Sequence, residues 1–108
     1  MTTFFVSRHS GAIEWARLQG LDAEPCPHLD VARLQAGDQV IGVLPAHLAA
    51  QVHAAGARYF HLAMDVPAER RGQEMSAVEM TACGARLVEI ECRIIAPGRT
   101  EFPLAERK

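Results

Sequence analysis

Short apolar segments alternate with segments of helical periodicity along this chain, and most of the helical segments end at a glycine. The clearest example is DQVIGVLP, whose nearly continuous apolar run at 39–44 is typical of a strand buried on both faces. AHLAAQVHAAG follows as a helix, with Pro45 at its first position and Gly56 at its end. Neighbouring parallel strands need crossover helices. The alternation therefore predicts a small α/β domain with a mostly parallel sheet of about five strands.

The expected elements occupy most of the first 96 residues. We predict strands at about 3–7, 26–29, 39–44, 57–64 and 85–95, and helices at about 11–20, 31–35, 46–55 and 76–83. Ser76 and Glu79 have the spacing of a capping box, and partial alternation in the last strand favours a sheet edge. A polar loop is expected at 65–74. Residues 1–96 are expected to form one domain, with a tail at 97–108.

Composition excludes several classes of function. A net charge of -2 gives no general attraction for long nucleic acid. The three cysteines form no CxxC pair, which favours reduced thiols in a cytoplasmic protein. We expect no signal peptide, because residues 1–3 lack a basic region and the apolar run that follows is only a few residues long. We expect no membrane segment, because no apolar run approaches about 18 residues. No zinc spacing and no nucleotide-binding glycine motif occurs, so we expect no metal and no cofactor. We also expect a homodimer, because a chain of 108 residues buries only a modest fraction of its surface and would gain stability by dimerisation.

Ligands of open α/β sheets bind beyond the carboxyl ends of the strands. We therefore take the residues at the end of each predicted strand and just beyond it as candidates for a binding site. They are Ser7, Arg8, His9, Ser10 and Gly11 at the first strand, His28 and Asp30 at the second, Gly42, Leu44, Pro45 and His47 at the third, and Arg71 in the loop after the fourth.

The turn after the first strand suits an anion. A helix N-terminus offers unpaired N–H groups and a positive dipole end, and Ser10 and Gly11 let the backbone approach a phosphate. Arg8 can add a bidentate contact, and His9 can carry a proton near neutral pH. The alternative is that Ser10 caps the helix and Arg8 is a solvated surface charge.

The remaining candidates have two interpretations each. His28 is either oriented by Asp30 or an ordinary loop histidine, and His47 either contacts a ligand or is an exposed helix residue. His61 lies inside a predicted strand and is expected to be a hydrogen-bonded core histidine. Arg71, with its neighbour Arg70, either closes over phosphates as a lid or is solvated.

A short stretch, VSRHSG, resembles the strand-end Arg-His-Gly motif of the histidine phosphatase superfamily. In members of that superfamily the histidine of this motif is phosphorylated, and a second catalytic histidine lies well downstream in the sequence. Here Ser10 stands in place of the glycine, and His61 precedes the loop where the second histidine is needed. A histidine phosphatase-like phosphohydrolase is therefore an alternative function.

A longer resemblance covers nearly the whole chain up to about residue 92. It rests on the ordered blocks FFVSRHSGAIEWARLQG, HLD, GDQVIGVLPAHLAAQVHAAGARYFHL, RRGQEMS and GARLVE. Together these blocks resemble the small CRISPR-associated family Csx-sixteen, named from type III CRISPR loci. The chain departs from the family pattern at Ser10, where RHPGA has proline, and at Val43, where GTLP has threonine. A threonine at position 43 would offer a hydroxyl that valine lacks.

That family is similar to ring nucleases, which bind and cut the cyclic oligoadenylate messengers of type III CRISPR systems. The resemblance implies a Rossmann-like, three-layer homodimer with cyclic tetra-adenylate bound across the two-fold axis. It also implies metal-independent attack by a ribose 2′-hydroxyl. Arg8 would stabilise charge, with Ser10 and the Gly11 amide holding phosphate. His9 is the first choice for proton transfer and His28 the second. The competing function is a sponge that binds the messenger without cutting it.

Overall fold

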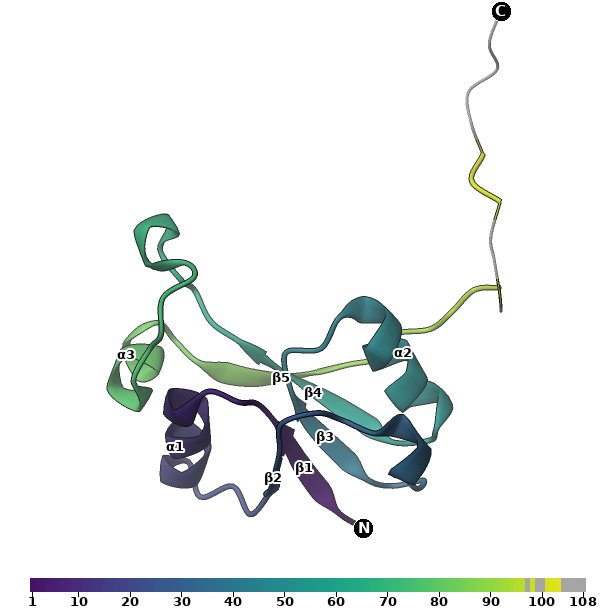
Figure 1. The fold of residues 1–108 in the computed structure, drawn as a ribbon, viewed down its shortest axis with the longest axis horizontal. Coiled ribbons are helices and arrows are strands. Elements are labelled where there is room, and N and C mark those ends of the chain that lie inside the picture. The colour runs from purple at the N-terminus through teal and green to yellow at the C-terminus, as the bar shows by residue number, and fades with distance from the viewer. Residues whose placement is uncertain (97, 99–100, 104–108) are drawn as a thin grey trace, which may run out of the picture.

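The computed structural model describes residues 1–96, 98 and 101–103, so most of the tail expected at 97–108 lies outside the described residues. Within these described residues, five strands and three α-helices alternate, with two short 3-10 turns between them (Figure 1). In chain order the elements are β1 (Thr3–Val6), α1 (Ser10–Leu18), β2 (Glu24–Cys26), η1 (Val31–Arg33), β3 (Gln39–Gly42), α2 (Ala46–Ala54), β4 (Arg58–Ala63), η2 (Ala68–Arg70), α3 (Ala77–Ala82) and β5 (Arg86–Ile90). None of the described helices is long and apolar enough to cross a bilayer.

The five strands form one sheet in the order β2-β1-β3-β4-β5. The first four are parallel to one another, and β5 pairs antiparallel with β4 at the edge. This confirms the predicted α/β class, the mostly parallel sheet and the position of the last strand. From β1 the chain runs outward to β2 and then returns across β1 to β3. The strand order therefore reverses between β1 and β3, which makes this the switch point of the sheet.

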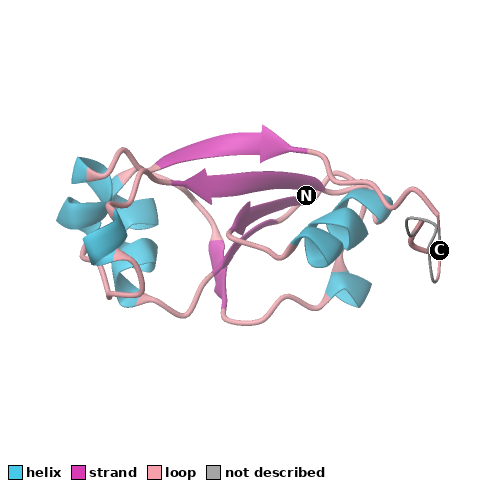
Figure 2. Ribbon diagram, turned by 90° about the horizontal axis from the view of Figure 1, so that it is seen from above, coloured by secondary structure: helices cyan, strands magenta, loops and turns pink. Residues whose placement is uncertain are grey.

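Helices cover both faces of the sheet, which gives the three layers of a small Rossmann-like domain (Figure 2). Alternate side chains of β1 and β3 enter opposite layers, as the two-residue period of a strand requires. Phe5 and Ile41 pack with α1 and α3 on one face. Val40 packs with α2 on the other face, where Phe4 adds to the cluster. The sheet therefore carries two separate cores.

Two strand predictions differ from the structure for identifiable reasons. The strand expected at 26–29 lies at Glu24–Cys26, because its partner β1 ends at Val6, which pairs with Cys26. The strand expected at 85–95 ends at Ile90, which pairs with Tyr59 near the start of β4. Beyond Ile90 only Arg58 of β4 remains, so a strand that continued to residue 95 would have no partner.

Helix ends follow the local signals closely. The Ser76 hydroxyl accepts from the Glu79 amide at 3.1 Å, and the Glu79 carboxylate accepts from the Ser76 amide at 2.9 Å, which confirms the capping box. Asp30 accepts from the Ala32 amide at 3.1 Å and caps the turn that follows it. The alternative in which Ser10 caps α1 is wrong, because His9 is the cap residue and Ser10 is already helical.

Candidate functional site

A cleft of about 540 Å³ opens at the carboxyl ends of β1, β3 and β4. Residues 7–9 after β1 and residues 42–43 at the end of β3 form two of its walls, and residues 72–75 form a third. The floor is apolar and includes the buried side chains of Phe5 and Leu62. The cleft lies where the strand order reverses, which is the place that an open α/β sheet offers to ligands.

The turn after β3 is fixed from below by Tyr59. Its hydroxyl accepts from the Leu44 amide at 2.9 Å and lies 3.1 Å from the Gly42 carbonyl oxygen, to which it can donate. Burial raises the pKa of Tyr59, so the hydroxyl keeps its proton. His61 Nδ1 lies 2.7 Å from the Tyr59 hydroxyl oxygen, so His61 is hydrogen-bonded as expected, but it is half-buried and not a core residue. A Cβ on Gly42 would lie 2.8 Å from the Val6 carbonyl oxygen, so glycine keeps the strands close here.

His9 is held at the mouth of the cleft by two contacts. Its amide donates to the Ser7 hydroxyl at 3.1 Å, which fixes the backbone of the turn. Its Nδ1 lies 2.8 Å from Oε1 of Glu74, which comes from the opposite wall. A carboxylate at Nδ1 favours the tautomer with the proton on that nitrogen. The Nε2 atom is then an acceptor that can take a proton from a ligand.

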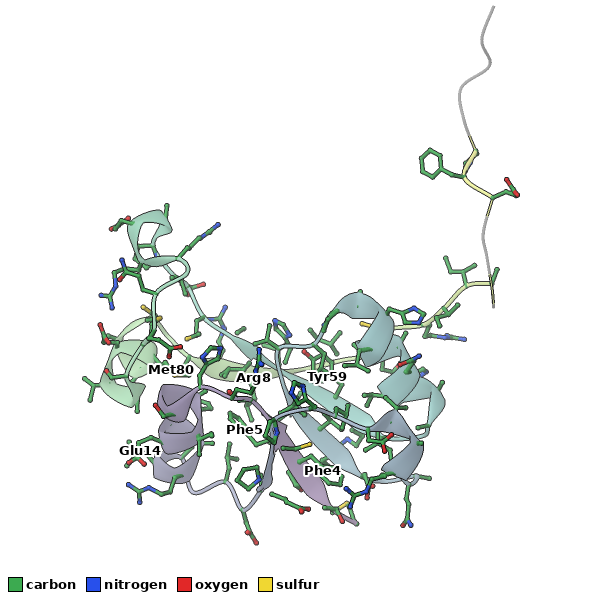
Figure 3. The ribbon with its side chains drawn as sticks, in the orientation of Figure 1. Phe4, Phe5, Arg8, Glu14, Tyr59 and Met80 are labelled. Carbon is green, nitrogen blue, oxygen red and sulfur yellow. The ribbon has the colours of Figure 1, made fainter. Side chains whose placement is uncertain are left out.

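Arg8 lies beside His9 on the cleft wall, and its side chain is exposed. In Figure 3 it is seen between Met80 and Tyr59, with Phe5 below it. Within the part of the chain that the structure describes, no carboxylate pairs with Arg8. Four other arginines do have carboxylate partners, namely Arg17 with Glu14, Arg58 with Glu89, Arg70 with Glu79, and Arg86 with Asp65. The Arg8 charge is therefore available to an anionic ligand.

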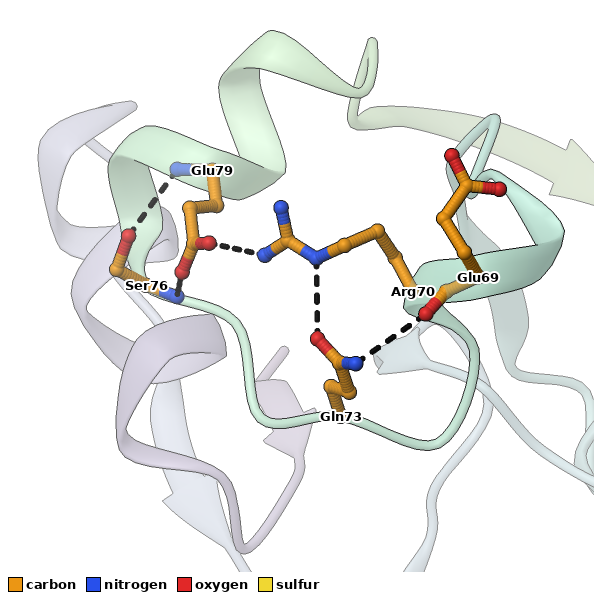
Figure 4. A network of polar contacts seen from close by, with 5 residues as sticks. All are labelled: Glu69, Arg70, Gln73, Ser76 and Glu79. Atoms are coloured by element: carbon orange, nitrogen blue, oxygen red, sulfur yellow. Dashed lines mark hydrogen bonds and ion pairs between the residues drawn. The ribbon is translucent and has the colours of Figure 1, made fainter.

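The third wall of the cleft is anchored to α3 by a polar network (Figure 4). Arg70 donates to the Gln73 side chain at 3.1 Å and to the Glu79 carboxylate. The Gln73 amide group in turn donates to the Glu69 carbonyl at 3.2 Å. The pKa of Glu79 lies below its ordinary value, first because of the Ser76 amide and then because of Arg70. Arg70 therefore supports the wall and is not a free cation.

The same wall packs tightly against the first turn of α1. A Cβ built on Gly11 would lie 1.8 Å from the Met75 carbonyl oxygen, a contact that no side chain tolerates. Gly11 therefore allows residues 72–75 to approach the helix and to bring Glu74 to His9. This packing role was not predicted, and the expected role of the Gly11 amide in holding phosphate stays a prediction.

The structure brings four of the predicted site residues into the cleft, namely Ser7, Arg8, His9 and Gly42. The other eight lie nearby but do not line it. Ser10 and Gly11 are in the first turn of α1, His28 and Asp30 are in the loop after β2, Leu44, Pro45 and His47 are at the start of α2, and Arg71 lines a shallower hollow beside the segment 65–75. Among the described residues no hydrogen bond joins Asp30 to His28, because Asp30 caps η1 instead. Ligand contacts by these eight stay predictions.

Sequence reasoning missed Glu74 and three methionines, Met64, Met75 and Met80, which all line the cleft. Glu74 lies 65 positions from His9 in a loop whose path has no periodicity. The methionines come from the end of β4, the third wall and α3, so no local pattern connects them.

Comparisons with known proteins give one match. No curated protein and no solved structure matches the chain significantly. A family model described as "Putative CRISPR-associated protein (Cas_VVA1548)" matches residues 4–93, which include every element of the sheet and all the walls of the cleft. Because the match covers most of the chain, this protein belongs to that CRISPR-associated family.

Proposed function

We propose that this CRISPR-associated protein is a ring nuclease that binds and opens cyclic tetra-adenylate. One observation carries the proposal. An arginine with no carboxylate partner among the described residues and a histidine oriented by Glu74 lie side by side in a cleft at the switch point. The chemistry of the ligand must then combine an anion with a group that exchanges a proton. A phosphodiester next to a ribose 2′-hydroxyl has both.

In the proposed reaction the 2′-oxygen forms a bond to the adjacent phosphorus while the bond to the 5′-oxygen breaks. The products are a 2′,3′-cyclic phosphate and a free 5′-hydroxyl. His9 Nε2 accepts the proton of the 2′-hydroxyl, and the leaving 5′-oxygen takes a proton from His9 or from water. Arg8 neutralises charge on the phosphorane oxygens. Placement of the 2′-hydroxyl in line with the leaving oxygen supplies much of the remaining acceleration.

We propose that two copies share one ring. A cleft of about 540 Å³ is of ordinary size for a small ligand, whereas the cyclic tetranucleotide has four phosphates to contact. Val43 forms part of the cleft wall and is 62% exposed, which leaves an apolar residue at the mouth for a second copy. A two-fold axis there would place two Arg8–His9 pairs on a ligand that can itself adopt two-fold symmetry.

The first experiment is incubation of the purified protein with cyclic tetra-adenylate in EDTA, followed by chromatography and mass spectrometry. We expect linear products that end in 2′,3′-cyclic phosphate, because the proposed chemistry needs no metal. An intact ring that never binds would contradict the proposal.

A sponge that holds the ring without cutting it is the second candidate. It is favoured by the exposure of the His9 and Glu74 side chains, 67% and 72%, which leaves the proton-transfer group in water. Single-turnover kinetics separate the two functions, because a sponge returns an intact, bound ring. The phosphatase alternative gains no support, since His9 is the one histidine among the described residues that line the cleft.

Arg8→Ala is expected to lower both ring affinity and the ring-opening rate, because the phosphate loses its charge-assisted hydrogen bonds. The expected loss is roughly 10- to 100-fold. Arg8→Lys is expected to recover part of the lost affinity and rate, because lysine restores the positive charge but not the two parallel hydrogen bonds of a guanidinium. Arg17→Ala serves as the control, since Arg17 pairs with Glu14 on the outer side of α1. If the binding isotherm and the single-turnover rate of Arg8→Ala match those of the wild-type protein, Arg8 does not contact the phosphate.

A further inference from the structure

Three of the four methionines in this chain lie around the cleft. Met64 follows β4, Met75 ends the third wall, and Met80 belongs to α3. Met80 is only 3% exposed, and Met64 and Met75 are half-buried against the same apolar cluster. Three separate segments therefore converge to give one side of the cleft a surface of thioethers.

Most of the aromatic side chains that could stack on a base are engaged elsewhere. Trp15 and Tyr59 are each 4% exposed and belong to the two cores. Phe60 lies under the Arg58 guanidinium, whose carbon is 5.0 Å from the ring centre. Phe5 lines the cleft but is 2% exposed in its floor. Phe102 is 78% exposed but does not line the cleft. Among the described residues, no exposed Phe, Tyr or Trp side chain lines the cleft.

We propose that Met64 and Met75, with the buried Met80 in the same lining, form the surface on which the cleft binds a purine base. This inference rests on the proposed function, because the base is an adenine of the cyclic oligoadenylate. Thioether sulfur is polarisable and makes favourable contacts with aromatic rings, and the unbranched side chain adapts to the ring that it meets. Arg8 lies in the same cleft, so phosphate and base have separate partners of matching chemistry.

The test follows the methionine methyl groups directly. Protein labelled with ¹³C at the methionine methyls has four signals, and Met1, which is 89% exposed and outside the cleft, serves as the internal reference. The probe is the 2′-deoxy analogue of cyclic tetra-adenylate, which lacks the attacking hydroxyl and stays intact. The matched control is the 2′-deoxy cyclic tetra-uridylate, which has the same phosphates and a base with a much weaker ring current.

We expect the methyl proton signals of Met64 and Met75 to shift upfield when the adenylate probe binds and to shift much less with the uridylate control. The Met1 signal should not shift with either compound. Methyl signals that do not move, or that respond equally to both rings, would overturn the inference even if cyclic tetra-adenylate is opened. Methyl shifts without ring opening would support the base site and contradict the catalytic proposal. Neither shifts nor ring opening would contradict both.

Substitutions give a second measurement. Met64→Ala and Met75→Ala are each expected to weaken adenine-ring binding by about 2- to 10-fold, the range for a contact between sulfur and an aromatic ring. The same variants should leave uracil-ring affinity nearly unchanged. Val78→Ala is the control, because Val78 is 77% exposed on α3 and does not line the cleft. An unchanged preference for adenine over uracil in both variants would overturn the inference.

Discussion

Ring opening is expected to slow by roughly 10²–10⁴-fold when His9 is replaced by alanine, the range for loss of a general acid or base. The reason lies in how the imidazole is placed. Glu74 occupies Nδ1 at 2.8 Å, which leaves Nε2 to receive the proton of the 2′-hydroxyl. The measurement is the single-turnover rate with cyclic tetra-adenylate, alongside ring affinity. Affinity should change far less than the rate, because Arg8 still holds the phosphate.

His53→Ala is the control for this prediction, since His53 lies near the end of α2 and does not line the cleft. If the single-turnover rate of His9→Ala stays within a few-fold of the wild-type rate, another group must exchange the proton. His28, in the loop after β2, is then the next residue to replace.

Glu74→Gln separates orientation of the imidazole from its presence. The amide cannot provide the carboxylate charge at His9 Nδ1, so the tautomer with the proton on that nitrogen loses its preference. We expect a lower kcat with little change in KM, together with a changed ¹⁵N tautomer signature of His9. An unaltered tautomer signature would show that Glu74 does not position the imidazole.

The elements of this fold are encoded locally, which is why sequence analysis places them well. A buried apolar run such as 39–44 suits a central parallel strand, and Ser76 and Glu79 are the right residue types at the right spacing for a cap. Their positions depend on neighbours three or four residues away. The turn at 7–9 is likewise found at the carboxyl end of a strand, where the topology of α/β sheets puts ligands.

The third wall of the cleft could not be predicted in the same way. Its path depends on contacts with distant residues, namely Gly11 against Met75 and Arg70 against Glu79. From the sequence, Gly11 is predicted to let a phosphate approach, because a glycine at a helix start is suited to close approach by a ligand. The structure adds a separate role, since the Met75 carbonyl oxygen lies where a side chain on residue 11 would be.

Gly11→Ala is therefore expected to displace the third wall of the cleft, residues 72–75, although residue 11 itself does not line the cleft. Its Cβ would lie 1.8 Å from the Met75 carbonyl oxygen, whereas real Cβ atoms essentially never approach within 3.0 Å, so the wall must move by more than 1 Å. Glu74 is the residue next to Met75 and would move away from His9. Because misplacement of a positioning group by about 1 Å can cost on the order of 10²-fold in rate, we expect a loss of that size in ring opening.

The experiment on Gly11→Ala needs evidence that the protein remains folded. Thermal unfolding and amide NMR spectra provide it, and the spectra should show the largest changes at residues 72–76. Leu18→Ala is the control, because Leu18 lies on the same helix with its side chain 58% exposed. Wild-type ring opening with undisturbed amide signals at 72–76 would mean that the helix moves instead of the wall. A folded variant that keeps ring affinity but loses the rate would show that the glycine serves catalysis by letting the Glu74 segment reach the histidine.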